Sequence, residues 1–332
     1  MCQTARSPLA EDVISAHDTP VRSTPTGPAT TSAAGLGSPG RALTALLRTL
    51  RPKQWVKNLF VAAPLVFSRH LINPTYLVRT ALAVLAFCVL SGAVYAFNDV
   101  RDADADRLHP TKRYRPIAAG ELSERAALIA AAGLAIGALG GCLLLSWKLA
   151  ALAALYLIQN AAYTLKLKQI AFVDVLSIAS GFLLRVLAGA AAINVPASRW
   201  LLVCTALLAT LLGFGKRAHE LAWAERTGSE GATRAALAGY TLSVLKLAML
   251  ALAPLTCAAF VTYTIDRHTI EFFGTDRLVY SAPFVGLGII RFLYLALWRP
   301  KDDPPTEAML RDPWFLLTLA GAAGTMLYAI YG

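Results

Sequence analysis

The chain has 332 residues, of which 56% are hydrophobic and only 15% are charged, and its formal net charge is +11. Soluble domains carry roughly 25% charged residues, so this composition and a mean hydropathy of +0.54 exclude an ordinary soluble protein and predict an integral membrane protein. Membrane topology and attraction to anionic lipid or phosphorylated substrates explain the net positive charge. A nucleic-acid partner is not needed to explain it.

The first part of the chain differs from the rest in composition. Residues 1–45 are rich in Ser, Thr, Pro, Gly and Ala and lack the apolar core of a signal peptide, so we interpret them as a disordered tail. No linker interrupts residues 46–332. We expect this region to be one all-α, polytopic membrane domain, because backbone groups in hydrocarbon must be satisfied within helices or a closed barrel, and the apolar runs lack strand alternation.

Apolar runs of sufficient length predict about nine transmembrane helices. They lie near residues 59–72, 75–97, 124–146, 149–165, 171–193, 200–215, 236–263, 279–298 and 313–331. If the N-terminus is inside, the inner segments hold 20 Lys and Arg residues and the outer segments hold six. This asymmetry predicts a cytoplasmic N-terminus and cytoplasmic loops after the second and sixth helices.

The stretch "RPKQWVKN" precedes the first predicted helix and carries Lys53 and Lys57. We expect these two ammonium groups to contact the phosphate of a substrate. The alternative is that they are ordinary membrane anchors, since basic residues and a Trp are common at cytoplasmic helix ends.

An acidic cluster, "NDVRDADAD", follows the second predicted helix. If the helix continues through it, Asn98, Asp99, Asp102 and Asp106 share one arc of about 100°, while Asp104 points away. Hard oxygen ligands of this kind suit Mg²⁺, which proteins bind through carboxylates together with substrate phosphates. The alternative is a solvated helix end that nearby arginines neutralise.

The loop "HPTKRYRPIAAG" supplies Lys112, Arg113 and Arg115 directly after the carboxylates. Acid followed by base is what a Mg²⁺-diphosphate requires, because the metal bridges the phosphate oxygens from one side and basic donors hold them from the other. We interpret His109 as structural, because no step that needs a base is evident.

The fourth and fifth helices carry the next candidates. Tyr163 and Lys166 lie at the end of the fourth helix, and Asp174 and Arg185 share a face of the fifth helix with the small residue Gly181. Ionisable residues within a span normally face a cavity or a partner. We expect Asp174 near the metal and Arg185 deeper in a cavity; the alternative is an internal ion pair that stabilises the bundle.

The sixth helix ends in "GKRAHEL", where Lys216 and Arg217 are further candidates for substrate binding. Lys216 and Glu220 also have the spacing of an ordinary helical salt bridge. The five cysteines form no metal or disulfide pattern.

The acidic motif resembles the N-D-x-x-D-x-x-x-D motif of the UbiA superfamily of intramembrane prenyltransferases. Within it, "RPKQWVKNLF", "HPTKRYRPIAAG", "DVLSIASGFLLR" and "GKRAHEL" are similar to stretches of the branch that transfers phosphoribosyl groups to decaprenyl phosphate. The resemblance extends over residues 48–331 and omits the tail. A second Asp-rich motif, common in the superfamily, is reduced here to Asp174, which favours a donor that completes the metal coordination itself.

The resemblance implies a Mg²⁺-dependent transferase that moves 5-phosphoribosyl from phosphoribosyl diphosphate to a polyprenyl phosphate, for cell-envelope glycan precursors. The catalytic residues would be Asp99, Asp102, Asp106 and Asp174, in a bacterial plasma membrane protein that forms a homo-oligomer. One alternative is an aromatic prenyltransferase with a prenyl diphosphate donor. Another is a transporter or lipid-binding scaffold, which would release no diphosphate.

Overall fold

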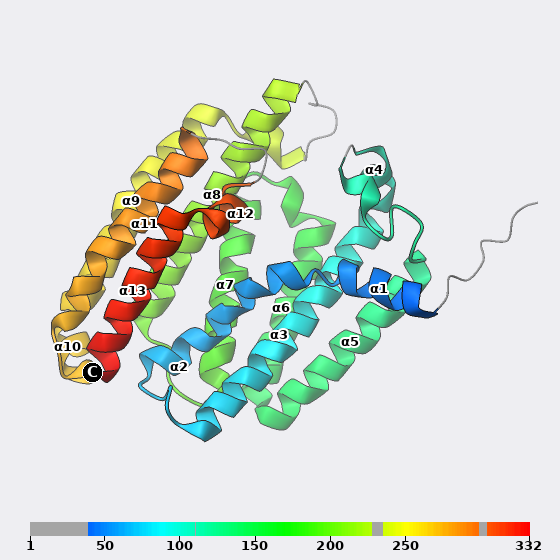
Figure 1. Ribbon diagram of the computed structural model, residues 1–332. Helices are drawn as coiled ribbons and strands as arrows, with labels where there is room; N and C mark the ends of the chain where they lie inside the picture. The colour runs from blue at the N-terminus through cyan, green and yellow to red at the C-terminus, as the bar shows by residue number, and fades with distance from the viewer. Residues whose placement is uncertain (1–38, 110, 228–234, 299–303) are drawn as a thin grey trace, which may run out of the picture. The chain divides into compact units, whose positions relative to one another are not determined.

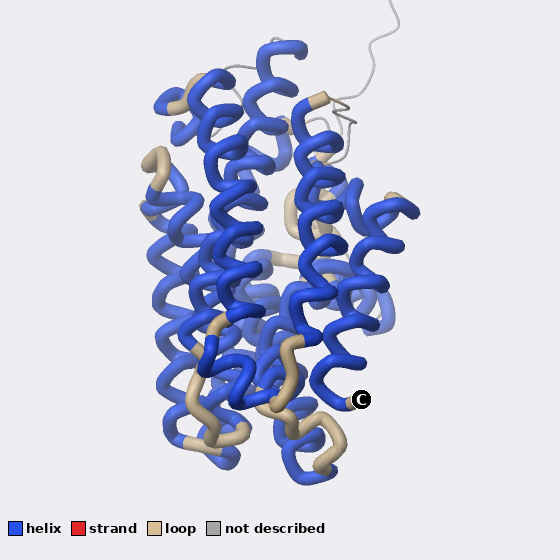
Figure 2. Tube along the Cα trace, turned by 90° about the vertical axis from the view of Figure 1, so that its left-hand side faces the viewer, coloured by secondary structure: helices blue, strands red, loops and turns tan. Residues whose placement is uncertain are grey.

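The computed structural model describes residues 39–109, 111–227, 235–298 and 304–332, and within these ranges the regular structure is helical, without strands. Figure 2 shows long helices that run alongside one another. The expected all-α fold is therefore confirmed. Most of the expected tail lies outside the described residues. Helix α1 (Pro39–Thr49) spans the expected boundary at residue 46, which stays a prediction.

The helices follow one another through short connections. The long ones are α3 (Pro74–Arg101), α5 (Glu124–Leu145), α6 (Trp147–Leu165), α7 (Val173–Ala192), α8 (Arg199–Thr227), α9 (Leu242–Ile265), α11 (Ala282–Leu297) and α13 (Pro313–Tyr331). The short ones are η1 (Pro52–Ala62), α2 (Ala63–Phe67), α4 (Ala103–Leu108), η2 (Lys112–Tyr114), η3 (Leu167–Gln169), η5 (Ala235–Gly239), α10 (Arg267–Phe273), η6 (Arg277–Ser281), α12 (Pro305–Ala308) and η7 (Met309–Arg311).

Seven of the described helices are long and apolar enough to cross a membrane: α3, α5, α7, α8, α9, α11 with the preceding η6, and α13. The first predicted helix is instead divided into η1 and α2, and α6 does not reach the same hydropathy. The count of nine is therefore not confirmed. The predicted loop after the sixth helix is also helical as far as Thr227, because α8 continues through "GKRAHEL".

Side-chain caps explain where several helices begin. Asn73 accepts hydrogen bonds from the backbone N–H groups of Thr75 and Tyr76 at the start of α3. Ser123, Thr241 and Asp312 cap α5, α9 and α13 in the same way. Such caps satisfy the donors that the first turn of a helix leaves without partners, which matters most where little water is available.

Helix α7 lies at the centre of the bundle and packs against η1, α6 and α8. Of its apolar stretch 61% is buried, compared with 11% for α5. Small residues permit this close packing: a Cβ atom added to Gly189 would overlap the backbone carbonyl oxygen of Val61 and lie 3.2 Å from Cδ of Pro64. Gly189 therefore allows η1 to lie directly against α7.

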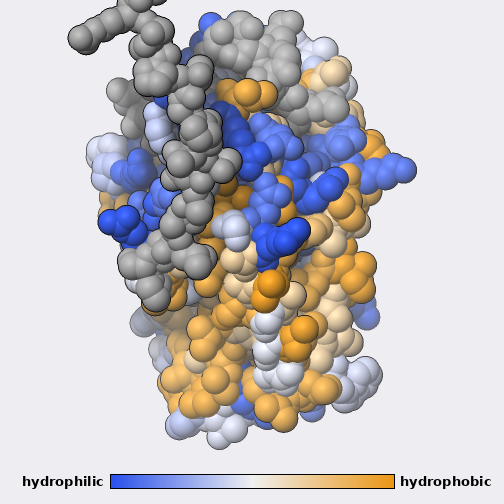
Figure 3. All heavy atoms as spheres, turned by 90° about the vertical axis from the view of Figure 1, so that its right-hand side faces the viewer, coloured by the Kyte–Doolittle hydropathy of each residue, from blue (hydrophilic) through white to orange (hydrophobic). Residues whose placement is uncertain are grey.

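Polar residues gather at one end of the bundle. Here α3, α6 and α8 end and α7 begins, and α4 and α12 lie nearby, in the upper part of Figure 1. We call residues 98–123, 166–174, 214–227 and 304–312 the charged end. Figure 3 shows hydrophilic side chains in the upper half of one face and mostly hydrophobic ones below, as expected for a bundle whose lower part faces lipid.

We predict that Gly189→Ala destabilises the protein, because the added methyl group must displace the backbone of η1. Overpacking of this kind costs about 1–3 kcal/mol, and the change should lower the melting temperature of the detergent-solubilised protein. Gly137→Ala is the matched control, since an added Cβ there meets nothing within 4 Å and Ala is the better helix former. Equal stability of the two variants would contradict the close packing of η1 on α7.

Candidate active site at the charged end

Two buried carboxylates form the centre of the charged end. Asp99 and Asp106 are 2% and 3% exposed, and Nη1 of Arg115 donates to both of them, at 3.1 Å and 2.6 Å. Nη2 of Arg51 donates to Asp99 at 2.5 Å. Two acids from different helices, α3 and α4, are thus held together by one guanidinium group, with a second guanidinium group beside them.

The backbone between these acids is not one continuous helix. Helix α3 ends at Arg101, Asp102 leaves helical geometry with φ −99° and ψ 5°, and α4 begins at Ala103. As a result Asp102 pairs with Nζ of Lys168 at 2.6 Å, on the side of η3. Asp104 is 97% exposed and pairs with Arg107, as its predicted outward direction requires.

The structure therefore modifies the predicted metal face. Asp99 and Asp106 converge, Asp102 is drawn toward Lys168, and Asn98 makes no side-chain hydrogen bond among the described residues. No group of three or more His, Cys, Asp or Glu residues that could hold a metal ion occurs in the described part of the chain. The two converging carboxylates nevertheless fit Mg²⁺, which is usually held by one or two carboxylates plus substrate phosphates.

The basic loop contributes to the site unequally. Arg115 contacts the buried acids, whereas Arg113 points to the exposed Tyr114, whose hydroxyl accepts from its Nη2 at 2.7 Å. The place of Arg113 in a phosphate clamp stays a prediction. Lys112 lies beside His109, and its backbone N–H donates to Nδ1 of His109 at 3.3 Å.

His109 connects the loop to α8. Its ring stacks on Trp223 with the centroids 6.1 Å apart and the planes at 12°. Burial, together with the positive charge of Lys112, lowers the pKa of His109 below its usual value. The stack joins the two polar segments at the charged end, and the structural role of His109 stays a prediction.

Asp174 and Arg217 form a fully buried ion pair, with Oδ2 of the acid 2.7 Å from Nε of the arginine. The hydroxyl of Tyr240 donates to Oδ1 of Asp174 at 2.6 Å; burial and this hydrogen bond raise the pKa of Tyr240. Arg217 also contacts Glu220 and the hydroxyl of Tyr163. Asp174 thus takes part in an internal ion pair, the alternative considered from the sequence, and the cation comes from α8. Its place near the metal stays a prediction.

Arg185 is a buried cation that has no carboxylate partner among the described residues. It is 7% exposed and donates to Oδ1 of Asn58 at 2.8 Å, to the hydroxyl of Tyr156 at 2.9 Å and to the carbonyl oxygen of Gly181 at 2.9 Å. Its guanidinium carbon lies 4.8 Å from the centre of the Tyr156 ring. The groups that contact the guanidinium group of Arg185 are thus neutral, and its positive charge is available to an anion.

The other candidate residues lie around this centre or at its rim. Lys57 is half-buried in η1, within reach of the charges of Arg185, Glu307 and Arg51. Lys53 and Lys166 are exposed, and Lys216 is half-buried on α8. Lys168, two residues after Lys166, is the lysine that reaches the acidic cluster.

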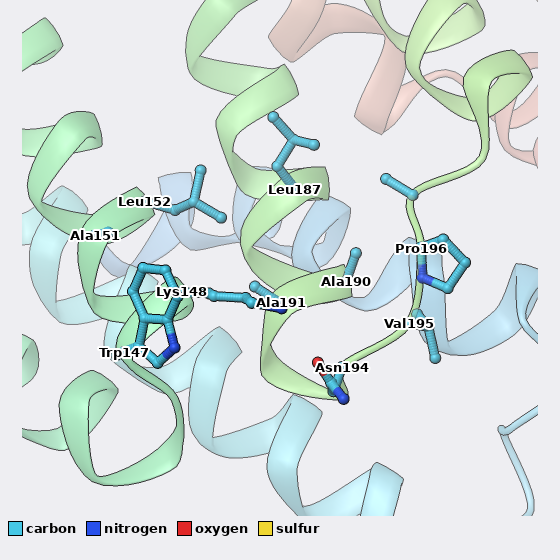
Figure 4. A pocket seen from close by; sticks show the side chains of 11 residues that line it. Trp147, Lys148, Ala151, Leu152, Leu187, Ala190, Ala191, Asn194, Val195 and Pro196 are labelled. Carbon is cyan, nitrogen blue, oxygen red and sulfur yellow. The ribbon is translucent and has the colours of Figure 1, made fainter.

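A pocket lies at the opposite end of the bundle. It has a volume of 560 Å³ and is formed by the start of α6, the end of α7 and the segment that follows α7. Figure 4 shows Trp147 and Lys148 on one side of it and Asn194 to Pro196 on the other. None of the residues predicted for catalysis lines this pocket, so its size does not make it the active site.

A model of the UbiA prenyltransferase family matches residues 59–319. The chain belongs to this family. It is 38% identical to a decaprenyl-phosphate phosphoribosyltransferase of Mycolicibacterium smegmatis, over 89% of this chain and 95% of that protein. It is 35% identical to a protein of the same name from Mycobacterium tuberculosis, over 73% of this chain and 82% of that protein.

The fold of this UbiA-family protein is also that of solved relatives. A UbiA homolog from Archaeoglobus fulgidus, determined with DMAPP and Mg²⁺, superposes with a TM-score of 0.66 at 17% identity, over 86% of this chain and 99% of that one. The family and the apolar helices together make the chain a multi-pass membrane protein.

Several residues of the site in this UbiA-family protein were not predicted from the sequence. Arg51 stands two residues before Lys53 in the same motif, and its contact with Asp99 depends on a left-handed backbone conformation, with φ 53°. Tyr240 and Glu307 belong to segments without a recognisable motif. They reach the charged end only because α8, α9 and α12 pack together.

We predict that Asp174→Asn destabilises the folded protein, because it leaves the buried Arg217 without its counter-charge. Breaking a buried pair in this way costs about 3–5 kcal/mol, and thermal unfolding in detergent should show the loss. Glu271→Gln, which removes an exposed pair with Arg267, should change the stability by less than about 1 kcal/mol. An inactive Asp174→Asn variant of unchanged stability would instead favour a catalytic role for Asp174.

Proposed function

We propose that this UbiA-family protein transfers the 5-phosphoribosyl group from phosphoribosyl diphosphate to a polyprenyl phosphate of the decaprenyl type, with Mg²⁺ as cofactor. The observation that carries the proposal is the pair of buried carboxylates, Asp99 and Asp106, surrounded by basic side chains. The sugar donor is supported by the two mycobacterial relatives, whose names state that they are phosphoribosyltransferases.

Asp99 and Asp106 are the residues proposed to hold the metal ion, with Asn98 and Asp102 as further ligands. In Asp99, Asp102 and Asp106, one carboxylate oxygen makes the ion pairs. The second oxygen of each has no partner among the described residues. Bound there, Mg²⁺ would neutralise the charge of the diphosphate and make it a better leaving group.

Arg51 and Arg115 are proposed to bind the phosphate oxygens of the donor. Both guanidinium groups already lie against carboxylates, and a diphosphate presents the same kind of charged oxygen acceptor. A cation bound among the carboxylates would weaken their ion pairs with Arg51 and Arg115. Further contacts at the rim of the site are proposed for Lys53, Lys112, Arg113, Tyr163, Lys166, Lys216 and Arg217.

Lys57 and Arg185 are proposed to receive the phosphate of the lipid acceptor. Arg185 is buried without a carboxylate partner, and the charge of Lys57 lies within its reach. The acceptor phosphate is ionised at neutral pH, so its attack needs no base. Its oxygen forms a bond with C1 of the ribose, the bond from C1 to the diphosphate breaks, and the diphosphate leaves with the electron pair.

The location of the reaction is part of the proposal. The 20 Lys and Arg residues of the inner segments, against six outside, favour a cytoplasmic charged end. Phosphoribosyl diphosphate would then enter from the cytoplasm, and the polyprenyl tail would remain in the bilayer. The relatives come from bacteria, which supports a bacterial plasma membrane, and a homo-oligomer is proposed on the resemblance alone.

We predict that Asp99→Asn lowers turnover at least about 100-fold. The substitution removes the negative charge of a proposed Mg²⁺ ligand, and this charge acts where the diphosphate leaves. Asp102→Ala should act in the same direction. Asp104→Asn is the matched control, since this side chain is 97% exposed, and it should keep wild-type turnover. Near-normal activity of Asp99→Asn in Mg²⁺-containing buffer would contradict the metal assignment.

The donor is tested with isolated membranes that contain the protein. We expect labelled phosphoribosyl diphosphate plus polyprenyl phosphate to give a labelled lipid and free diphosphate, and EDTA to stop both. A prenyl diphosphate plus an aromatic acid should give no product. Product in the second mixture alone would identify an aromatic prenyltransferase, and the absence of diphosphate release from both would favour a transporter or scaffold.

A further inference from the structure

Glu307 is a half-buried carboxylate at the charged end that makes no ion pair among the described residues. Glu307 lies in α12, which packs against α8 and α11, and it is half-buried. Nε2 of Gln54, in η1, donates to its Oε1 at 3.1 Å. This hydrogen bond joins the last part of the chain to the segment that carries Arg51 and Lys57.

Glu307 is linked to the acidic pair through η1. Its partner Gln54 lies one turn after Arg51, whose guanidinium group contacts Asp99. The guanidinium carbon of Arg51 also lies 4.9 Å from the centre of the Tyr95 ring. Tyr95 lies one helical turn before Asp99, on the same face of α3. The carboxylate of Glu307 is thus held against the segment whose Arg51 contacts both Asp99 and Tyr95.

Unlike four other acids of the charged end, Glu307 has no counter-ion in contact among the described residues. Asp99, Asp102, Asp106 and Asp174 each have an Arg or Lys nitrogen within 4.0 Å. Within the described ranges no such ion pair involves Glu307, and its carboxylate accepts only from the neutral amide of Gln54. It therefore retains hydrogen-bond acceptor capacity beside the site.

The chemistry of the two substrates limits what this carboxylate can contact. An ionised carboxylate only accepts hydrogen bonds. Phosphates and the diphosphate carry like charge and would be repelled, and a polyprenyl tail offers no donor. The only groups on either substrate that can donate to Glu307 are the hydroxyls of the ribose.

We propose that Glu307, oriented by Gln54, accepts a hydrogen bond from a ribose hydroxyl of the donor and thereby selects a sugar diphosphate over a prenyl diphosphate. This inference rests on the proposed function. A prenyl diphosphate has no hydroxyl, so it would leave the carboxylate desolvated and without a donor. A buried acceptor that is left without a donor weakens binding, and this is why hydrogen-bonding sites reject analogues that lack the hydroxyl.

The test compares phosphoribosyl diphosphate with its 2-deoxy and 3-deoxy analogues, as labelled donors with polyprenyl phosphate. The wild-type protein should use at least one analogue about 10- to 100-fold less well, in kcat/KM, than the natural donor, as expected for a hydrogen bond to a charged group. In Glu307→Gln the ratio of kcat/KM for the natural donor to kcat/KM for this analogue should shrink several-fold. In Glu307→Ala the ratio should approach one. The half-saturating Mg²⁺ concentration should not change.

Glu121→Gln is the matched control. Glu121 also joins two segments at the charged end, through a pair with Arg48 at 2.7 Å, and it is about half-exposed. It should keep the full preference for the natural donor. A merely structural role of Glu307 would lower turnover of all three donors by the same factor, and an unchanged preference in Glu307→Gln would overturn the inference.

Two further outcomes separate this inference from the proposed function. If the wild-type protein uses the natural donor and both deoxy analogues equally well, the inference fails, whether or not the variants fold, while the proposed function stands. If the wild-type protein does not use phosphoribosyl diphosphate at all, the proposed function fails and this inference fails with it. A raised Mg²⁺ requirement in Glu307→Gln would assign the carboxylate to the metal instead and would also overturn the inference.

Discussion

The need to neutralise carboxylates that are removed from water governs the charged end of this protein. Asp99 and Asp106 are almost completely buried, and a charge in such a place is stable only with a counter-charge in contact. Arg115 supplies it by donating to both acids with one nitrogen, and Arg51 adds a second guanidinium group. The same contacts that stabilise the acids hold two cations where a diphosphate can meet them.

Helix α7 gives these pairs a fixed frame. Its small residues let η1 approach closely at Gly189, and η1 carries Lys57 and Asn58 to the interior. Arg185 of α7 donates to Asn58, so the same helix contact that packs the bundle also orients this buried cation. At the other end of α7, Asp174 is held by Arg217 and anchors α8. Packing and charge placement therefore depend on each other.

Much of this could be predicted from the sequence, and the limits of prediction have physical causes. The apolar runs identified most helices, and the helical arc identified Asp99 and Asp106 as inward and Asp104 as outward. The arc placed Asp102 less well, because the helix is interrupted at that residue. A face computed on one regular helix cannot anticipate a break, since Lys168 of a distant segment competes for the side chain.

The sequence by itself determined the all-helical membrane fold, the family and the acidic motif, because hydropathy and local spacing follow directly from the order of residues. Only the tertiary structure decided which cation meets which acid: Arg217 rather than Arg185 at Asp174, and Lys168 at Asp102. It also brought Glu307 to η1 through Gln54, across most of the length of the chain. Ion pairs between distant helices depend on how the helices pack, and no local pattern encodes that distance.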